Sequence, residues 1–252
     1  MDLCLHDRVY VVTGASRGLG RATAQTLVDE GARVVVSSRR AASVQATVES
    51  LGASVATGVV ADNADPATPQ LLIDAARSEY GRLDGALISV GGPAAGSVLD
   101  ITDDQWKAAF GAVFLGAVRL ARALAGALPA EGSIAFVLST SVKQPIPGLS
   151  VSNGLRPGLA MVAKTLADEL GPRGIRVNGL LPGRVDTERV RELDAAGGEA
   201  EAAKRAATEA IPLRRYGEPA EFGRAAAFVL SPAASYITGV MLPVDGGITR
   251  SL

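Results

Sequence analysis

Short runs of β-branched and other apolar residues alternate with longer stretches rich in Ala and Leu along the whole chain. The short runs have the composition of strands buried on both faces and lie at 9–12, 33–36, 55–60, 86–88, 134–138 and 175–177. The longer stretches have helical length and lie at 20–30, 41–51, 68–80, 103–128, 153–170 and 219–230. Because consecutive strand–helix–strand units form right-handed crossovers, the sequence predicts an α/β fold with a parallel sheet and helices on both of its faces.

The composition limits the classes of protein to which the chain can belong. It has 252 residues, 48% of them hydrophobic, and a formal net charge of −1 with the charges scattered along the sequence. These values are typical of one domain over residues 1–252 and predict neither a nucleic-acid partner nor a membrane partner. Cys4 is the only cysteine and His6 the only histidine, so neither an intrachain disulfide nor a Cys/His metal cluster can form. With no targeting segment recognisable at the N-terminus, we expect a cytoplasmic location.

One segment departs from the alternation. Residues 187–211 are rich in Ala, Glu and Arg and contain two consecutive glycines, a composition that favours a mobile helical flap over the substrate. Its three arginines are candidates for attracting an acidic carrier or substrate: Arg189, Arg191 and Arg205. The alternative is an amphipathic helix pair whose charges only keep the surface soluble.

A glycine pattern follows the first predicted strand. Residues 13–20 read Thr-Gly-Ala-Ser-Arg-Gly-Leu-Gly, and a helical stretch follows them. Backbone N–H groups and the helix dipole at such a turn favour a phosphate, so this segment predicts a dinucleotide-binding loop. The alternative is a tight turn without a ligand. The residues expected to contact the cofactor are Gly14, Ser16, Arg17, Gly18, Leu19 and Gly20.

The Thr-Gly-x-x-x-Gly-x-Gly pattern resembles the signature of the short-chain dehydrogenase/reductase family, and further motifs in the same order extend the resemblance over essentially the whole chain. These are Ser89-Val90-Gly91-Gly92, Ser139 after the fifth strand, the segment Pro182–Thr187, Tyr236–Gly239 and Val244–Gly247. The resemblance implies a single doubly wound Rossmann-type α/β domain with a central, mostly seven-stranded parallel sheet. Within the family, the chain is most similar to the carrier-protein β-ketoacyl reductases.

The resemblance also implies roles for individual residues. Ser139 corresponds to the catalytic serine of the family, and Gly91 lies in the turn that follows the fourth strand. The Pro-Gly segment is expected to hold the nicotinamide carboxamide through Pro182, Gly183, Val185 and Thr187.

The end of the second strand bears on the choice between NAD(H) and NADP(H). Enzymes of this fold that are strict for NAD usually have an acidic residue there, whereas this chain has Ser38 followed by Arg39. Arg17 and Arg39 are candidates for charge-assisted hydrogen bonds to a 2′-phosphate, which predicts that NADP(H) is preferred over NAD(H). The alternative is that Arg39 and Arg40 are solvated residues at a helix start. Asp62 is expected to accept a hydrogen bond from the adenine amino group, with Asn63 lining the same pocket.

The reaction centre departs from the family pattern of Asn, Ser, Tyr and Lys. Val113 stands at the Asn position, Ser152 at the Tyr position and Arg156 at the Lys position, so only Ser139 is retained. A serine hydroxyl is a far poorer acid than a phenol, and an arginine does not release its proton at neutral pH. The ordinary proton donor is therefore missing.

Other residues remain for catalysis. Ser152 and Arg156 are four residues apart and share a helix face, so Arg156 is expected to bind the ribose hydroxyls and to place a positive charge near the carbonyl oxygen. Four residues are weaker candidates for replacing the missing proton donor: Lys143, Ser141, Ser150 and Tyr216. The predicted catalytic residues are Ser139, Ser152 and Arg156.

Three functions remain open. The leading one is an NADPH-dependent oxidoreductase that reduces the carbonyl of a small molecule, free or carrier-bound, by an atypical proton path. The second is an NADP(H)-binding protein with little or no reductase activity and a structural or regulatory role. The third is an enzyme that uses the cofactor for dehydration or epimerisation. The retained Ser139, the glycine loop and the Pro-Gly segment favour the oxidoreductase.

Two long helical stretches predict an assembly. The stretches 103–128 and 153–170 carry apolar residues on more than one face, more than the sheet alone needs. The resemblance implies a homotetramer with helices packed between subunits, and a dimer is the alternative.

Overall fold

The computed structural model describes residues 1–196 and 198–251. Its strands are β1 (Val9–Val12), β2 (Arg33–Ser38), β3 (Ala56–Val60), β4 (Gly85–Ile88), β5 (Ser133–Val137), β6 (Arg176–Pro182) and β7 (Met241–Val244). Its α-helices are α1 (Gly18–Asp29), α2 (Ala41–Leu51), α3 (Thr68–Tyr80), α4 (Asp103–Ala109), α5 (Gly116–Ala127), α6 (Ser150–Leu170), α7 (Glu188–Ala195), α8 (Ala200–Ala210) and α9 (Pro219–Leu230). Short helices of other types are the π-helix η1 (Phe110–Leu115) and the 3₁₀ turns η2 (Thr140–Val142), η3 (Gly171–Arg173) and η4 (Pro232–Ala234).

The seven strands form one sheet in the order β3-β2-β1-β4-β5-β6-β7, and every neighbouring pair is parallel. The order changes direction between β1 and β4, which makes the carboxyl ends of these two strands the switch point where ligands bind in open α/β sheets. The predicted doubly wound α/β fold with a seven-stranded parallel sheet is confirmed.

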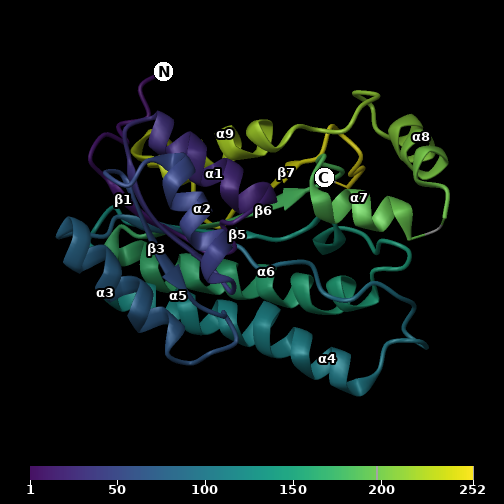
Figure 1. Cartoon of the computed structure of the whole chain (residues 1–252), viewed down its shortest axis with the longest axis horizontal. Helices are drawn as coiled ribbons and strands as arrows, with labels where there is room; N and C mark the ends of the chain where they lie inside the picture. Colours follow the sequence, from purple (N-terminus) through teal and green to yellow (C-terminus); the bar gives the residue numbers. More distant parts are fainter. Residues whose placement is uncertain (197, 252) are drawn as a thin grey trace.

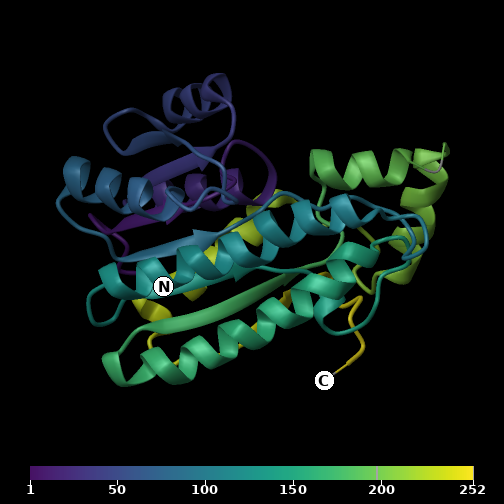
Figure 2. The same ribbon diagram turned by 90° about the horizontal axis from the view of Figure 1, so that it is seen from below.

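Helices cover both faces of the sheet (Figures 1 and 2). α1, α2 and α9 lie on one face, and α3, α5 and α6 lie on the other. Each face has its own apolar core, because the β-branched residues of the central strands alternate between the two sides. β3 differs from the central strands, since it is an edge strand and two of its five residues, Gly58 and Val60, are exposed.

Most element bounds agree with the sequence pattern. The exceptions are β6, which ends at Pro182 and not at the predicted residue 177, and the start of α6. This helix begins at Ser150, three residues before the predicted start at residue 153. Neither Ser152 nor Asn153 caps it; the Asn153 side chain instead bonds the backbone N–H and carbonyl of Ile146 at 3.0 and 2.9 Å. Pro157 therefore lies inside the helix, where its ring cannot donate to the carbonyl of Asn153.

The predicted helix at 103–128 is a continuous helical run in which η1 separates α4 from α5. By length and composition this run, Asp103–Ala127, could cross a membrane. Part of the run packs in the core of the sheet, however, through Ala117, Leu120, Ala121 and Leu124, as expected for a core helix.

Candidate functional site

The glycine loop joins β1 to α1 at the carboxyl edge of the sheet. Gly14 and Gly18 have φ values of +59° and +55°, a backbone conformation that favours glycine. Gly20 has no room for a side chain, because a Cβ there would lie 2.5 Å from the carbonyl oxygen of Gly14. Ser16 and Leu19, both partly buried, complete the loop. The loop therefore presents backbone at the start of α1, as a phosphate-binding turn requires.

Polar contacts hold this loop at the switch point. The Thr13 hydroxyl donates to the Ser89 carbonyl at 2.7 Å and accepts from the Ser89 N–H at 2.9 Å, so the end of β1 is tied to the segment after β4. The Asn63 amide donates to the same hydroxyl and the same carbonyl, at 3.4 and 3.3 Å. Asn63 thus connects the segment after β3 to the glycine loop. Its side-chain amide is used for these protein contacts, which stabilise the loop.

The end of β2 carries polar atoms that have no partner in the described chain. The Ser37 and Ser38 hydroxyls are buried and make no hydrogen bond. Arg39 and Arg40 follow them and are exposed. Their guanidinium groups form no ion pair with any Asp or Glu of the residues that the structure describes. Asp62 uses one carboxylate oxygen to accept from the Ala64 N–H at 2.9 Å and leaves the other free. Buried hydroxyls without partners are rare in folded proteins, and these two lie on opposite faces of the sheet at the carboxyl end of β2, where the cofactor is expected.

Arg17 is engaged with the flap. Its Nη1 ion-pairs the carboxylates of Glu188 and Glu192 on α7. The hydrogen bond with Glu188 raises the pKa of Arg17, and the same bond lowers the pKa of Glu188. Sequence patterns did not indicate this pairing, because the partners lie 171 and 175 residues apart.

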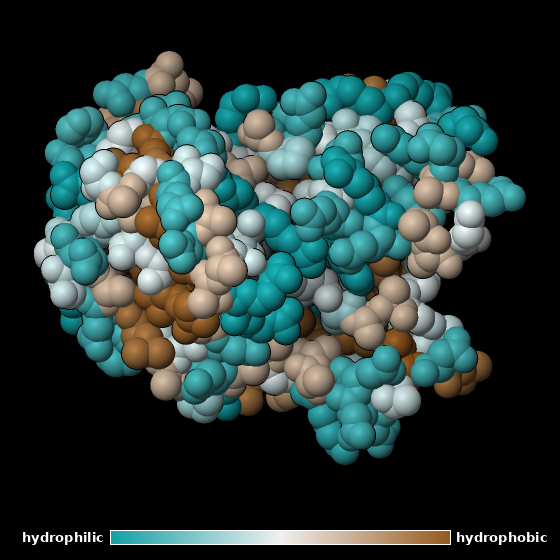
Figure 3. All heavy atoms as spheres, viewed as in Figure 1, coloured by the Kyte–Doolittle hydropathy of each residue, from teal (hydrophilic) through white to brown (hydrophobic). Residues whose placement is uncertain are grey.

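A second contact holds α7 to the loop after β4. Arg189 donates from Nη2 to the carbonyl oxygen of Pro93 at 2.6 Å, and its Nε lies 2.6 Å from where a Cβ at Gly92 would be. Gly91 faces open space, with no atom within 4 Å of a Cβ placed there. The flap helices therefore lie at the carboxyl edge of the sheet, and in Figure 3 the surface is indented between them and the α4 region.

The Pro-Gly segment lies beside the glycine loop. Pro182 ends β6, and Gly183 has no room for a side chain next to the C-terminal segment. Val185 is buried, and Thr187 caps α7 through its hydroxyl. The Thr187 methyl group lies 3.5 Å from the Cβ position of Gly18, so the two predicted cofactor-binding segments meet.

Ser139 and Ser152 approach one another through a third serine. The Ser139 hydroxyl oxygen accepts from the Ser141 N–H at 3.1 Å and caps η2. The Ser141 hydroxyl lies 3.1 Å from the Ser152 hydroxyl, and both side chains are buried. Sequence reasoning gave Ser141 only a minor place, whereas the structure puts it between the two predicted catalytic serines.

Arg156 is buried at the end of β5. Its side chain is 6% exposed, and Nη1 donates to the carbonyl oxygen of Val137 at 2.6 Å. Burial lowers the pKa of Arg156 to about 10, so the guanidinium remains charged at neutral pH. Val137 lies two residues before Ser139, and the positive charge therefore stands at the same strand end as the retained serine.

The other positions considered for proton transfer have structural contacts. Val113 is buried within η1, a π-helical segment of the kind that is frequent at functional sites. Ser150 donates to the carbonyl oxygen of Gly96 at 2.7 Å. Tyr216 donates to Asp194 at 3.1 Å, and burial together with this bond raises the pKa of the phenol to about 12. Lys143 is exposed in the loop after η2.

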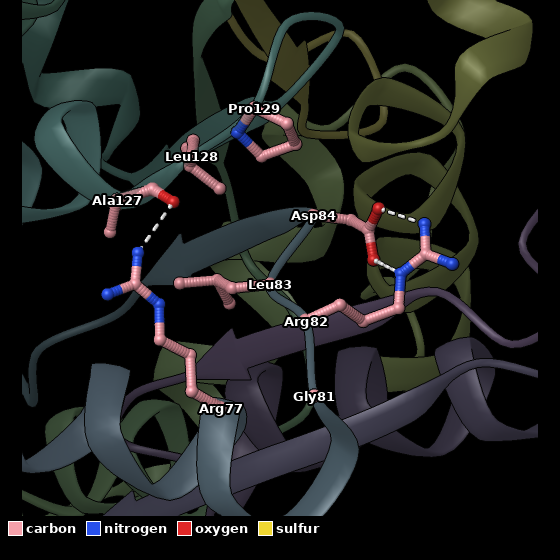
Figure 4. A pocket seen from close by; sticks show the side chains of 8 residues that line it. All are labelled: Arg77, Gly81, Arg82, Leu83, Asp84, Ala127, Leu128 and Pro129. Carbon is pink, nitrogen blue, oxygen red and sulfur yellow. Dashed lines mark hydrogen bonds and ion pairs between the residues drawn. The ribbon is translucent and has the colours of Figure 1, made fainter.

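A shallow depression of about 440 Å³ lies at the other edge of the sheet, where the chain enters β4 and β5 (Figure 4). Arg82 and Asp84 form a two-bonded ion pair there at 2.9 and 2.7 Å, and Arg77 donates to the Ala127 carbonyl at 3.3 Å. The depression lies at the amino ends of β4 and β5, whereas the glycine loop lies at the carboxyl ends of the strands. We therefore do not assign the depression to the cofactor.

Comparison with known proteins agrees with this geometry. The family described as enoyl-(acyl carrier protein) reductase matches residues 14–249. Human dehydrogenase/reductase SDR family member 4 is 34% identical over 254 residues, which cover 98% of this chain and 90% of the human protein. L-Sorbose reductase from Gluconobacter frateurii, solved with NADPH and L-sorbose, has a TM-score of 0.92 and 28% identity over 100% of both chains. A 3-ketoacyl-(acyl-carrier-protein) reductase from Brucella melitensis, solved with NADH, has a TM-score of 0.86 and 28% identity, covering 97% of this chain and 99% of its own.

The glycine loop, the strand order and the position of Ser139 thus agree with a match that spans nearly the whole sequence. The chain belongs to the short-chain dehydrogenase/reductase family of oxidoreductases.

Proposed function

We propose that this protein is an NADPH-dependent reductase of small carbonyl compounds with an atypical proton path. The observation that carries the proposal is the charged guanidinium of Arg156 at the end of β5, beside the retained Ser139. A fixed positive charge and a hydroxyl donor at one place stabilise the negative charge that develops on a carbonyl oxygen during reduction.

The residues at the end of β2 fit NADP(H) better than NAD(H). The chain has no carboxylate there for a ribose 2′-hydroxyl; it has a hydroxyl without a partner at Ser38 and exposed guanidinium groups at Arg39 and Arg40. Arg17 is a further candidate for the 2′-phosphate if it leaves Glu188. When bound, NADPH supplies the hydride. Gly14, Gly18 and Gly20 would hold its diphosphate, and the other predicted contacts are Ser16, Leu19, Asp62, Asn63, Gly91, Pro182, Gly183, Val185 and Thr187.

The protein residues would bind the carbonyl oxygen of the substrate and stabilise its developing negative charge. The Ser139 hydroxyl oxygen accepts from the Ser141 N–H, and its own proton is left to donate to the carbonyl oxygen of the substrate. Arg156 adds electrostatic stabilisation of the negative charge on the carbonyl oxygen. Ser152 contributes a hydroxyl that lies 3.1 Å from the Ser141 hydroxyl. None of these groups releases a proton easily at neutral pH, so the proton that completes the alcohol comes from water or from the substrate.

One observation favours a second candidate function, an NADP(H)-binding protein that lacks reductase activity. No phenol or lysine occupies the Tyr and Lys positions. Tyr216, the one phenol among the candidate replacements, is hydrogen-bonded to Asp194. A positioned general acid contributes about 10²–10⁴ in rate, so its loss leaves a slow enzyme or none.

The setting of the reaction follows the family resemblance. We infer a homotetramer, with the dimer as the alternative, acting in the cytoplasm on a free or carrier-bound substrate. Cys4 is a free, exposed cysteine, as suits a reducing compartment.

Titration of nucleotide fluorescence tests the cofactor, and NADPH oxidation tests the reaction. NADPH should bind at least about tenfold more tightly than NADH, equivalent to about 1.4 kcal/mol. Arg39→Ala should remove most of that preference, whereas Arg205→Ala, on α8, should not. Equal affinities for the two nucleotides would refute the cofactor assignment. If a range of ketones and aldehydes leaves bound NADPH unoxidised, the binding-protein function is the better one.

A further inference from the structure

Two buried arginines of this chain differ in the number of acceptors around them. Arg176 is 7% exposed, and its guanidinium donates to four backbone carbonyls at 2.7–3.4 Å, those of Val229, Leu230, Ser231 and Ile237. Arg156 is 6% exposed and donates to one carbonyl, that of Val137. Because a guanidinium has five N–H donors, Arg176 is a satisfied structural group, whereas most donors of Arg156 remain for ligands. The ribose hydroxyls that we expect there are neutral and leave the charge of Arg156 uncompensated.

The charge of Arg156 is also uncompensated. No Asp or Glu among the described residues pairs with it, and desolvation is the one influence on its pKa, with no nearby charge opposing it. A buried cation without a counterion is costly, and such charges in proteins are normally paired. The missing partner is therefore an anion from outside the chain.

A hydroxyl lies next to this cation. Ser152 precedes Arg156 by one helical turn on the same face of α6, and both side chains are buried. The Ser152 and Ser141 hydroxyls are 3.1 Å apart, and either can donate. When Ser141 donates, the Ser152 proton is free to turn toward a ligand held by Arg156.

We propose that Arg156 and Ser152 bind the carboxylate of the substrate, and that this substrate is a 2-oxo acid. The planar guanidinium fork matches the two oxygens of a carboxylate, and the serine hydroxyl adds a third donor. A phosphate, with more charge and three acceptor oxygens, needs more donors than these two side chains supply. The proposal rests on the proposed reductase function and specifies its substrate class.

The position of the carbonyl follows from β5. Arg156 is bonded to Val137, and Ser139 lies two residues further at the same strand end. In a 2-oxo acid the carboxylate is attached directly to the carbonyl carbon. One molecule can therefore place its carboxylate on Arg156 and its keto oxygen at the Ser139 hydroxyl.

The reaction balances with NADPH and water. The carbonyl carbon gains a hydride from bound NADPH, the C=O electron pair moves to oxygen, and that oxygen takes a proton from water. A C–H and an O–H bond form, the 2-oxo acid is reduced to a 2-hydroxy acid, and NADPH is oxidised to NADP⁺. Arg156 remains protonated throughout and acts on substrate binding and orientation.

A ligand that resembles the substrate but is not reduced tests this site directly. Oxamate, a 2-oxo acid analogue that is not reduced, is titrated into the protein by calorimetry, with and without NADP⁺. Its neutral ester, ethyl oxamate, and inorganic phosphate serve as comparison ligands.

We expect oxamate to bind at least about tenfold more tightly than ethyl oxamate or phosphate. Arg156→Met should remove this preference, and Arg156→Lys should retain part of it. Far-UV circular dichroism and a cooperative thermal unfolding transition show whether each variant is folded. The proposal is wrong if oxamate binds no better than its ester, if phosphate binds equally well, or if folded Arg156→Met still prefers oxamate.

Turnover separates this proposal from the proposed function. 2-Oxobutanoate and butanone differ in a carboxylate at the carbonyl carbon, and NADPH oxidation is followed with each. A KM for 2-oxobutanoate at least about tenfold below that for butanone supports the substrate class. Equal use of both overturns the 2-oxo acid while leaving the reductase intact. Tight, Arg156-dependent oxamate binding without reduction of either compound upholds the carboxylate site and overturns the reductase.

Discussion

At the scale of single residues, the buried Arg156 side chain, which we propose binds the substrate, should lower the stability of the folded protein. Arg156 has one hydrogen-bond acceptor and no counterion, whereas Arg176 has four acceptors. Replacing a buried ion pair by apolar residues of similar volume is often neutral or stabilising by about 1–4 kcal/mol, and a buried charge without a counterion, as at Arg156, should cost the fold no less. Leaving buried carbonyls without donors costs about 1–3 kcal/mol for each.

Arg156→Met should therefore raise the melting temperature, and Arg176→Met should lower it. For a chain of this size, 1 kcal/mol corresponds to roughly 2–4 °C. Differential scanning calorimetry of the two variants beside the wild type measures both shifts. If both substitutions lower the melting temperature equally, Arg156 is a structural residue like Arg176.

A second prediction concerns the reaction centre. The combined substitutions Val113→Asn, Ser152→Tyr and Arg156→Lys restore the family pattern around Ser139, and a phenol with a reference pKa of about 10 replaces a hydroxyl that hardly ionises. Reduction of simple ketones should rise, up to the 10²–10⁴ that a positioned general acid contributes. Ser152→Ala alone should change the turnover of simple ketones little, since serine is too weak an acid to be the proton donor and a simple ketone has no carboxylate for its hydroxyl to bind.

NADPH oxidation is measured for the triple variant and for Val113→Asn alone, which controls for the polar group placed in the buried η1. A triple variant that is folded, binds NADPH and reduces nothing would support the binding-protein function. Strong wild-type turnover that disappears in Ser152→Ala would show that the serine has been misjudged.

Residue identities at the site could be predicted from the sequence, but their partners could not. The positions of Ser139, Ser152 and Arg156 followed from motif spacing, and the structure brings them to the end of β5 and the start of α6. Arg17 pairs with Glu188, which is 171 residues away in the sequence. This contact depends on where α7 lies in the fold, and no local sequence pattern indicates that. The orphaned Ser37 and Ser38 hydroxyls likewise become visible only when burial is known.

At the scale of elements, apolar periodicity located helices well and the start of α6 poorly. α2, α3 and α9 have the predicted bounds, because each has a consistent apolar face and begins or ends at Pro or Gly. α6 starts after Leu149 without a side-chain cap, so no capping residue marks its start in the sequence. η1 depends on a local change in backbone hydrogen bonding that apolar spacing does not reveal.

The flap supplies the element-scale prediction. Glu188→Gln with Glu192→Gln removes the ion pairs between α7 and Arg17, together with the 3.7 Å pair between Glu192 and Arg189, and keeps the Arg189–Pro93 hydrogen bond. Hydrogen–deuterium exchange of residues 188–195 should accelerate. If Arg17 binds the 2′-phosphate, NADPH affinity should rise severalfold, because the competing carboxylates are gone.

Glu201→Gln on α8 is the matched control, since it removes an exposed carboxylate that makes no ion pair within the described chain. Exchange in α7 that is unchanged in the double variant would mean that the ion pairs contribute nothing to holding the flap. An unchanged NADPH affinity would assign the 2′-phosphate to Arg39 alone.

At the scale of the whole molecule, the sheet explains why fold prediction succeeded where site prediction was partial. Every crossover joins neighbouring strands except the one from β3 to β4, which passes β2 and β1, so the alternation of strands and helices was enough to predict a parallel sheet. β1 and β4 adjoin at the switch point. The site, in contrast, combines residues from segments on both sides of that point, namely the glycine loop, η2, α6 and α7. Its chemistry depends on the distances between those segments.

The last prediction concerns assembly. On the face formed by the α4–α5 run and α6, which lie side by side in Figure 2, Phe110 is 46% exposed and Met161 is 64% exposed. Phe110 stacks on Phe114 with ring centroids 5.3 Å apart, and Gly158 of α6 packs against Phe114. Exposed aromatic and methionine side chains on adjacent helices are typical of a buried interface between subunits.

Light scattering should therefore give four times the chain mass of 25.7 kDa, or twice that mass for the dimer. Phe110→Glu with Met161→Glu should shift the protein to a smaller species, because two charges cannot be buried unpaired at an interface. Leu213→Glu is the control, since Leu213 is equally exposed, at 63%, but belongs to the segment between α8 and α9. A wild-type monomer at micromolar concentration would contradict the prediction, and so would a double variant that keeps the wild-type mass.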